Sequence, residues 1–128
     1  MRAPSAGEPA PDFTLRDQHG QDVALAELRG EPVVLLFYPF AFSRVCSGEL
    51  RSIRDDHPAL ARSGVRLLAI SCDPMYSLRA FADAEQLRVP LLSDFWPHGA
   101  VARRYGVLDE ERGCARRSTF VVDGQGTV

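Results

Sequence analysis

The pattern of apolar and polar positions predicts strands and helices in alternation along the 128 residues. Residues 12–16 alternate in the manner of a strand, the polar run 17–21 supplies a turn, and two further apolar residues alternate at 23 and 25. We therefore expect the chain to open with a short hairpin. Residues 33–38, Val-Val-Leu-Leu-Phe-Tyr, form a continuous apolar run, which is typical of a strand buried on both faces of a sheet.

A helix is predicted directly after this strand, over residues 44–60, because apolar residues recur there with helical spacing. Pro58 lacks an N–H and clashes with the preceding turn, so we expect a kink or a break beside it. Gly64 ends the helix, and residues 65–71 form a second apolar run. The strand, helix and strand make a βαβ crossover, whose two strands should be parallel.

The second half of the chain adds four expected elements and a turn. They are a helix over 77–87, an edge strand over 90–94, a short helix over 98–105, a strand over 118–123 and a turn over 123–126 that points to an antiparallel hairpin. This layout predicts an α/β, thioredoxin-like fold, with a central mixed sheet flanked by helices and an N-terminal hairpin. Such a layout normally closes with a return strand and a final helix. We expect a single domain over residues 1–128 in which that C-terminal strand and helix are missing.

Composition excludes several classes of function. All fifteen basic residues are Arg, seventeen residues are acidic, and the formal net charge is −2, so nothing favours a nucleic-acid partner. No stretch approaches the roughly 18 apolar residues of a membrane span, and the first residues lack the apolar segment of an export signal. The cysteines, Cys46, Cys72 and Cys114, form an odd and unpatterned set without metal-ligand spacing. We expect a cytoplasmic protein with free thiols, no membrane partner, no metal and no cofactor.

Cys46 is the strongest candidate for chemistry because of its position. It lies just beyond the first central strand, and reactive groups gather at the carboxyl ends of strands in open α/β sheets. If Ser43 is the N-cap, Cys46 is the third residue of the helix, where unpaired N–H groups and the positive end of the helix dipole favour the thiolate. Placement alone also fits a buried structural cysteine, since cysteine often serves as a small hydrophobic residue.

The string from Pro39 to Cys46, Pro-Phe-Ala-Phe-Ser-Arg-Val-Cys, resembles the PxxxT/SxxC signature of the peroxiredoxins at all three fixed positions. The resemblance covers nearly the entire chain, through residues 10–15, Glu49, 91–101, 105–107 and 117–123. The string Ser-Asp-Phe-Trp-Pro-His-Gly within it is most similar to the AhpE-type one-cysteine peroxiredoxins of the alkyl hydroperoxide reductase and thiol-specific antioxidant family. The resemblance thus implies a thioredoxin-like fold and a thiol-dependent peroxidase.

The resemblance also implies roles for individual residues. Cys46 would attack hydrogen peroxide or an organic hydroperoxide and become a sulfenic acid. Ser43 would take the family's hydroxyl role, Pro39 would shield the sulfenate, and Arg117 would hold the thiolate and polarise the O–O bond. Glu49 matches the acidic residue that positions such an arginine.

Two other arginines, Arg116 and Arg44, lie close in sequence to the predicted site residues. Arg116 lies beside Arg117, and adjacent side chains of a strand face opposite sides, so only one can point inward. The Arg-x-Thr-Phe-Val pattern selects Arg117. Arg44 stands where related sequences often carry a small residue; a cation there could lower the cysteine pKa, but we expect it to point into solvent.

The sulfenic acid must be reduced by a thiol. The position five residues after Cys46, where some peroxiredoxins carry a resolving cysteine, is Arg51. The resemblance therefore implies an external thiol reductant, either a low-molecular-weight thiol or a glutaredoxin-like or thioredoxin-like protein. Cys72, at the end of the second central strand, and Cys114, just before Arg117, remain possible resolving cysteines.

Two alternatives to a peroxidase stay open at this point. The first is a peroxide sensor or redox-dependent binding module, in which oxidation of Cys46 alters an interface. The second is a non-catalytic truncation product, because loss of the return strand would expose a sheet edge. Family resemblance suggests a homodimer in addition to the peroxide and reductant as partners.

Overall fold

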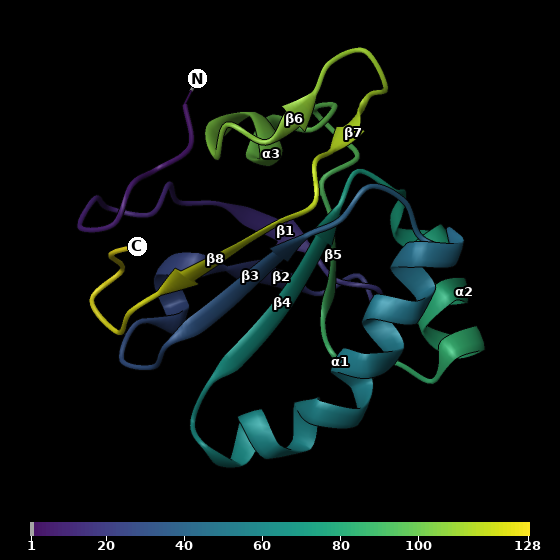
Figure 1. Ribbon diagram of the computed structural model, residues 1–128, viewed down its shortest axis with the longest axis horizontal. Helices are drawn as coiled ribbons and strands as arrows, with labels where there is room; N and C mark the ends of the chain where they lie inside the picture. Colours follow the sequence, from purple (N-terminus) through teal and green to yellow (C-terminus); the bar gives the residue numbers. More distant parts are fainter. Residues whose placement is uncertain (1) are drawn as a thin grey trace.

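The computed structural model describes residues 2–128, except for the side chains of residues 44–47 (Figure 1). Its elements are β1 (Thr14–Arg16), β2 (Asp22–Ala24), a 3-10 helix η1 (Leu25–Leu28), β3 (Val33–Phe37), α1 (Arg44–Arg62), β4 (Arg66–Ser71), α2 (Met75–Glu85), β5 (Leu91–Ser93), α3 (Ala100–Arg104), β6 (Leu108–Asp109), β7 (Cys114–Ala115) and β8 (Ser118–Val122). The predicted opening hairpin, central strands and three helices are all present.

One mixed sheet organises the chain, with its strands in the order β2-β1-β5-β4-β3-β8. The βαβ prediction is confirmed, because β3 and β4 pair in parallel and α1 makes the crossover between them. β8 runs antiparallel to β3, and β1 runs antiparallel to both β2 and β5. The predicted thioredoxin-like class, a mixed sheet with flanking helices, is therefore confirmed.

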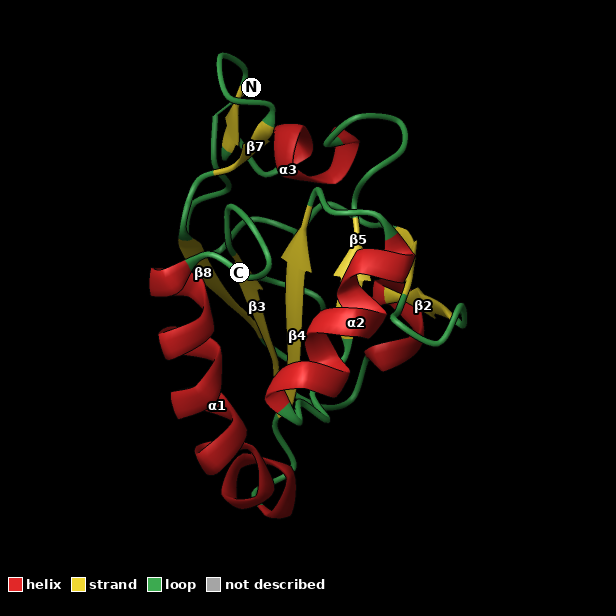
Figure 2. Cartoon of the chain, turned by 90° about the vertical axis from the view of Figure 1, so that its right-hand side faces the viewer, coloured by secondary structure: helices red, strands yellow, loops and turns green. Residues whose placement is uncertain are grey.

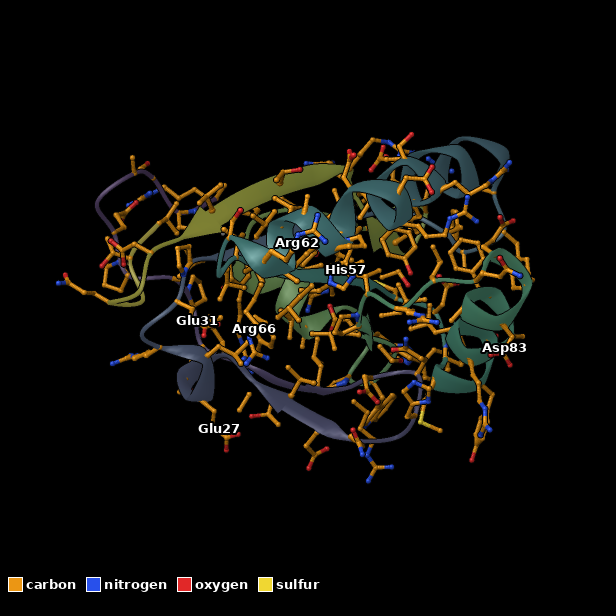
Figure 3. All side chains as sticks on the ribbon, turned by 90° about the horizontal axis from the view of Figure 1, so that it is seen from below. Glu27, Glu31, His57, Arg62, Arg66 and Asp83 are labelled. Carbon is orange, nitrogen blue, oxygen red and sulfur yellow. The ribbon has the colours of Figure 1, made fainter. Side chains whose placement is uncertain are left out.

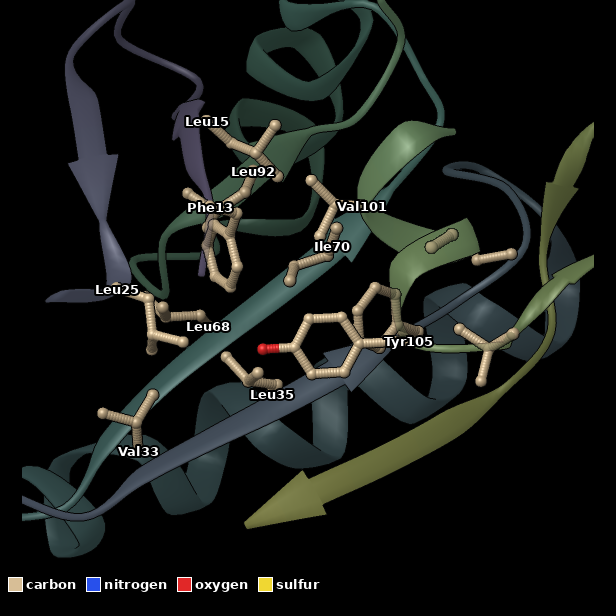
Figure 4. Packing of buried hydrophobic residues seen from close by; sticks show 14 of the residues in the cluster. Phe13, Leu15, Leu25, Val33, Leu35, Leu68, Ile70, Leu92, Val101 and Tyr105 are labelled. Carbon is tan, nitrogen blue, oxygen red and sulfur yellow. The ribbon is translucent and has the colours of Figure 1, made fainter. Parts of the chain in front are cut away.

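The sheet separates two apolar clusters, and the alternation of side chains along a strand explains which residue joins which cluster. In β3, Val33, Leu35 and Phe37 enter the cluster that β1, η1 and α3 cover (Figure 4). Helices α1 and α2 lie on the opposite face of the sheet (Figure 2). Leu36 enters the cluster on that face, which includes Leu50 of α1 and side chains of α2. Both faces of the central strands are thus buried, as the continuous apolar run predicted.

The prediction of an edge strand at residues 90–94 was wrong. β5 lies inside the sheet, with β4 on one side and β1 on the other. The N-terminal hairpin occupies the position beyond β5, and a short apolar run carries no information about which strands will flank it.

The prediction beside Pro58 was a kink or a break, and the break is absent, since α1 continues through this proline to Arg62. The ribbon of α1 instead changes direction in its last part (Figure 1). Ile53 and Leu60, on either side of the proline, both pack against the cluster under α1 and α2. Their burial stabilises the helix on both sides and compensates for the missing N–H.

β8 is the last strand of the described residues, and it lies at one edge of the sheet. The predicted turn follows it: the Asp123 carboxylate accepts hydrogen bonds from the N–H groups of Gln125 and Thr127 at 2.9 and 3.0 Å. The turn leads the chain to the N-terminal segment, where Thr127 forms an antiparallel bridge with Pro9. A second small hairpin, β6–β7, was not predicted, because each strand has only two residues.

Candidate active site

The candidate site lies at the carboxyl ends of β3 and β4, where the chain leaves two neighbouring parallel strands. α1 begins at Arg44, directly after Ser43, so Cys46 is the third residue of the helix. The first N–H groups of a helix lack helical partners, and their dipoles favour a negative charge at this end. The side chains of Cys46 and Arg44 lie outside the described residues, so their predicted orientations stay predictions.

The loop between β3 and α1 carries two other predicted residues, Pro39 and Ser43, both half-buried. Its backbone turns sharply at Phe42, whose φ of 65° lies in the left-handed region that bulky residues rarely adopt. The Phe42 ring lies 5.0 Å from that of Phe81 in α2, which holds the turn against the neighbouring helix. The loop therefore presents Pro39 and Ser43 at the start of α1 in a defined conformation.

Arg117 and Glu49 form an ion pair across this site. Arg117 Nη1 donates to Glu49 Oε2 at 2.6 Å, and the two side chains are 36% and 30% exposed. Glu49 belongs to the second turn of α1, while Arg117 directly precedes β8, whose Ser118 pairs with Phe37 at the end of β3. The pair places the guanidinium of Arg117 beside the helix that carries Cys46. The catalytic roles of both residues remain predictions.

Asp73 also contacts the loop, although no pattern in the sequence indicated a role for it. Its Oδ2 accepts a hydrogen bond from the N–H of Ala41, in the middle of the loop, at 2.8 Å. The only sequence signal was its place two residues beyond the end of β4, at the sheet edge where functional groups gather.

The turn between β6 and β7 approaches the same loop from another side. The guanidinium carbon of Arg112 lies 5.5 Å from the centre of the Phe40 ring, which is a cation–π distance. Three separate segments thus contact the loop before α1 or the helix itself: the turn containing Arg112, the residues after β4 and the residue before β8.

The other two cysteines differ in environment from a reactive thiol. Burial raises the pKa of the Cys72 thiol to about 12, with further contributions from the charges of Asp94 and Cys114. Cys72 is half-buried just after β4, and Cys114 is buried in β7. A raised pKa leaves little thiolate at neutral pH and makes Cys72 a slow nucleophile.

The described residues contain neither a metal-binding cluster nor a helix that could span a membrane. Within the part of the chain that the structure describes, no three His, Cys, Asp or Glu side chains are grouped so that they could hold a metal ion. None of the helices described is both long enough and apolar enough to span a membrane.

Comparisons with known proteins agree with the geometry. The sequence pattern of the AhpC/TSA family matches residues 6–128 of this chain. Alkyl hydroperoxide reductase E of Mycobacterium tuberculosis is 47% identical over 125 residues, which are 97% of this chain and 82% of that protein. Peroxiredoxin Q of Gentiana triflora chloroplasts is 37% identical over 97% of this chain and 57% of its own length.

Solved structures give the same result. Peroxidoxin BcpB from Mycobacterium tuberculosis superposes with a TM-score of 0.89 at 35% identity, covering 98% of this chain and 82% of that one. AhpC from Enterococcus faecalis superposes with a TM-score of 0.87 at 30% identity, covering 97% and 77%. The resemblance to AhpE-type peroxiredoxins is thereby confirmed, and the chain belongs to the AhpC/TSA family as a peroxidase enzyme of the peroxiredoxin type.

Proposed function

We propose that this peroxidase reduces hydrogen peroxide and organic hydroperoxides through a sulfenic acid at Cys46, which an external thiol then reduces. The observation that supports this proposal most is the ion pair of Arg117 with Glu49 beside the first turns of α1. It keeps a cation at the end of the helix where the thiolate would form, and an adjacent cation lowers a cysteine pKa.

In the first step, the Cys46 thiolate attacks one oxygen of the peroxide. The S–O bond forms as the O–O bond breaks, and the leaving oxygen takes up a proton and departs as water or an alcohol. Arg117 stabilises the charge on the departing oxygen, the Ser43 hydroxyl donates a hydrogen bond to the reacting oxygen, and Pro39 limits the access of water. Cys46 is left as a sulfenic acid.

In the second step, an external thiol attacks the sulfenic sulfur and displaces water, which gives a mixed disulfide. A second thiol attacks this disulfide and restores Cys46 as a thiol. We propose a low-molecular-weight thiol or a glutaredoxin-like or thioredoxin-like protein as the donor. The high pKa of Cys72 favours an external donor over this cysteine, whose resolving role, like that of Cys114, remains an alternative to be tested.

The test is the second-order rate of oxidation by hydrogen peroxide and by an alkyl hydroperoxide, followed through the fluorescence of Trp96, the only tryptophan. We expect a rate several orders of magnitude above that of a free thiol, which is lost in Cys46→Ser and lowered about 100-fold or more in Arg117→Ala. A rate equal to that of a free thiol would overturn the proposal.

Turnover with an added thiol separates the peroxidase from a sensor. Sustained turnover that survives in a variant with Ser at positions 72 and 114 supports the external reductant. Oxidation without turnover for any reductant would favour the sensor, and loss of turnover in the double variant would favour an internal resolving cysteine.

We further propose a cytoplasmic, single-domain protein that forms homodimers. Phe40, Phe42, Phe95 and Trp96 expose aromatic rings on the loops that follow β3 and β5, and such rings are enriched at protein interfaces. Analytical ultracentrifugation tests this assembly: a mass of one chain across micromolar concentrations would exclude the dimer.

A further inference from the structure

The main chain of Asp73 is held by hydrogen bonds at the ends of the parallel strands β4 and β5. Its carbonyl oxygen accepts a hydrogen bond from the Ser93 hydroxyl at 2.6 Å, and its N–H donates to the Ser71 hydroxyl at 3.3 Å. Ser71 and Ser93 are the last residues of β4 and β5, and they pair directly in the sheet. Asp73 therefore stands at a rigid point next to the candidate site.

The carboxylate of Asp73 connects this point to the loop after β3. Its Oδ2 accepts two hydrogen bonds of 2.8 Å, one from the Ser71 hydroxyl and one from the N–H of Ala41. Ala41 is half-buried and packs against the cluster under α1 and α2. The bond to Ala41 joins β4 to the segment that carries Pro39 and Ser43, which are two residues away on either side.

The loop needs such a restraint because of its backbone. Phe42 follows Ala41 and has a φ of 65°, a conformation that persists only where the surroundings impose it. Its ring packs against Phe81, and the N–H before it is held by Asp73. Side chain and backbone are thus fixed by two independent contacts.

We propose that Asp73 is a positioning residue for the peroxidase reaction, whose carboxylate holds Pro39 and Ser43 in place at the start of α1. The inference rests on the proposed function, since it concerns the same site. Asp73 acts through the Ala41 N–H and the loop rather than on the peroxide. A misplacement of about 1 Å costs roughly 100-fold in rate when it affects groups that surround a reacting centre.

The first experiment compares three variants of Asp73 in the rate of oxidation by hydrogen peroxide. Asp73→Ala and Asp73→Ser remove the acceptor or shorten it beyond reach of Ala41, and we expect each to slow oxidation at least tenfold. Asp73→Asn keeps an amide oxygen that accepts the same N–H, so its rate should stay within threefold of wild type. Asp83→Ala, which removes an exposed carboxylate of α2, is the matched control and should leave the rate unchanged (Figure 3).

The second experiment is hydrogen exchange at the Ala41 amide, which needs no turnover. We expect exchange at least tenfold faster in Asp73→Ala and Asp73→Ser than in wild type or Asp73→Asn. Oxidation rates of the Ala and Ser variants within threefold of wild type would overturn the proposal, and so would a rate that falls without any change in Ala41 exchange. An Asn variant as slow as the Ala variant would also overturn it, because charge rather than the hydrogen bond would then matter. If wild type itself reacted as slowly as a free thiol, the peroxidase mechanism at Cys46 would fail, whereas the exchange data would still decide whether Asp73 holds the loop.

Discussion

The ion pair of Glu49 and Arg117 makes a quantitative prediction for the oxidation rate. Fully exposed ion pairs contribute about 0.2–1 kcal/mol, whereas a hydrogen bond to a charged group contributes about 1.5–3 kcal/mol. The two atoms are 2.6 Å apart and about a third of each side chain is exposed, so the pair falls between these cases. We therefore assign the ion pair a contribution of about 1–2 kcal/mol to holding Arg117 in its orientation. Loss of this contribution corresponds to an oxidation rate that is roughly 5- to 30-fold lower.

The assay is a double-mutant cycle on the stopped-flow rate of oxidation by hydrogen peroxide. Glu49→Gln should slow oxidation about 5- to 30-fold, as derived from the pair energy, and Arg117→Ala about 100-fold or more, because it removes a donor to the departing oxygen. Since Glu49 is expected to act only through Arg117, the double variant should be no slower than Arg117→Ala alone. A further 5-fold loss from Glu49→Gln in the Arg117→Ala background would refute this reasoning, because the two residues would then act independently.

A matched control is available at the opposite end of the sheet. Glu31 pairs with Arg66, the first residue of β4, at 3.1 Å, with about half of each side chain exposed (Figure 3). Glu31→Gln removes the same charge from a similar pair far from the start of α1. Its oxidation rate should remain within about twofold of wild type, as expected for an exposed pair.

Three further predictions concern reactivity and stability. Because burial raises the pKa of Cys72 to about 12, its alkylation by iodoacetamide should accelerate about tenfold per pH unit from pH 8 to 11, and a plateau below pH 9 in mass-spectrometric labelling would contradict this. Leu35→Ala empties a fully buried position in β3 and should lower the free energy of unfolding in urea by about 3 kcal/mol, whereas Val121→Ala, on the exposed face of β8, should cost less than about 0.5 kcal/mol. Gly106→Ala should destabilise the fold by at least about 1 kcal/mol more than Gly30→Ala. Both glycines have a positive φ, but of the two only Gly106 lies where an added Cβ would collide with the backbone of the N-terminal segment. Equal midpoints of urea unfolding for the two variants would contradict this collision.

Much of the fold could be predicted because local patterns determine it. The run in β3 is apolar at every position since both faces of the strand are buried, and the pattern states this directly. The parallel pairing of β3 and β4 follows from chain connectivity, because a helix must return the chain to the same end of the sheet. The position of β5 between β4 and β1 depends instead on where the N-terminal hairpin docks, which no residue of β5 encodes.

The same distinction explains what the sequence revealed of the candidate site. Pro39, Ser43 and Cys46 lie within one short segment, so their spacing is visible in the chain itself, and Arg117 was found through a pattern shared with a family. The Asp73 contact joins a side chain to a backbone N–H thirty-two residues earlier, and every residue except proline offers such a donor. The pairing of β3 with β4 and the turn at Phe42 bring the N–H of Ala41 to the Asp73 carboxylate, and both exist only in the folded chain. Side-chain chemistry can therefore be recognised from sequence, whereas the hydrogen bonds that orient it require the three-dimensional structure.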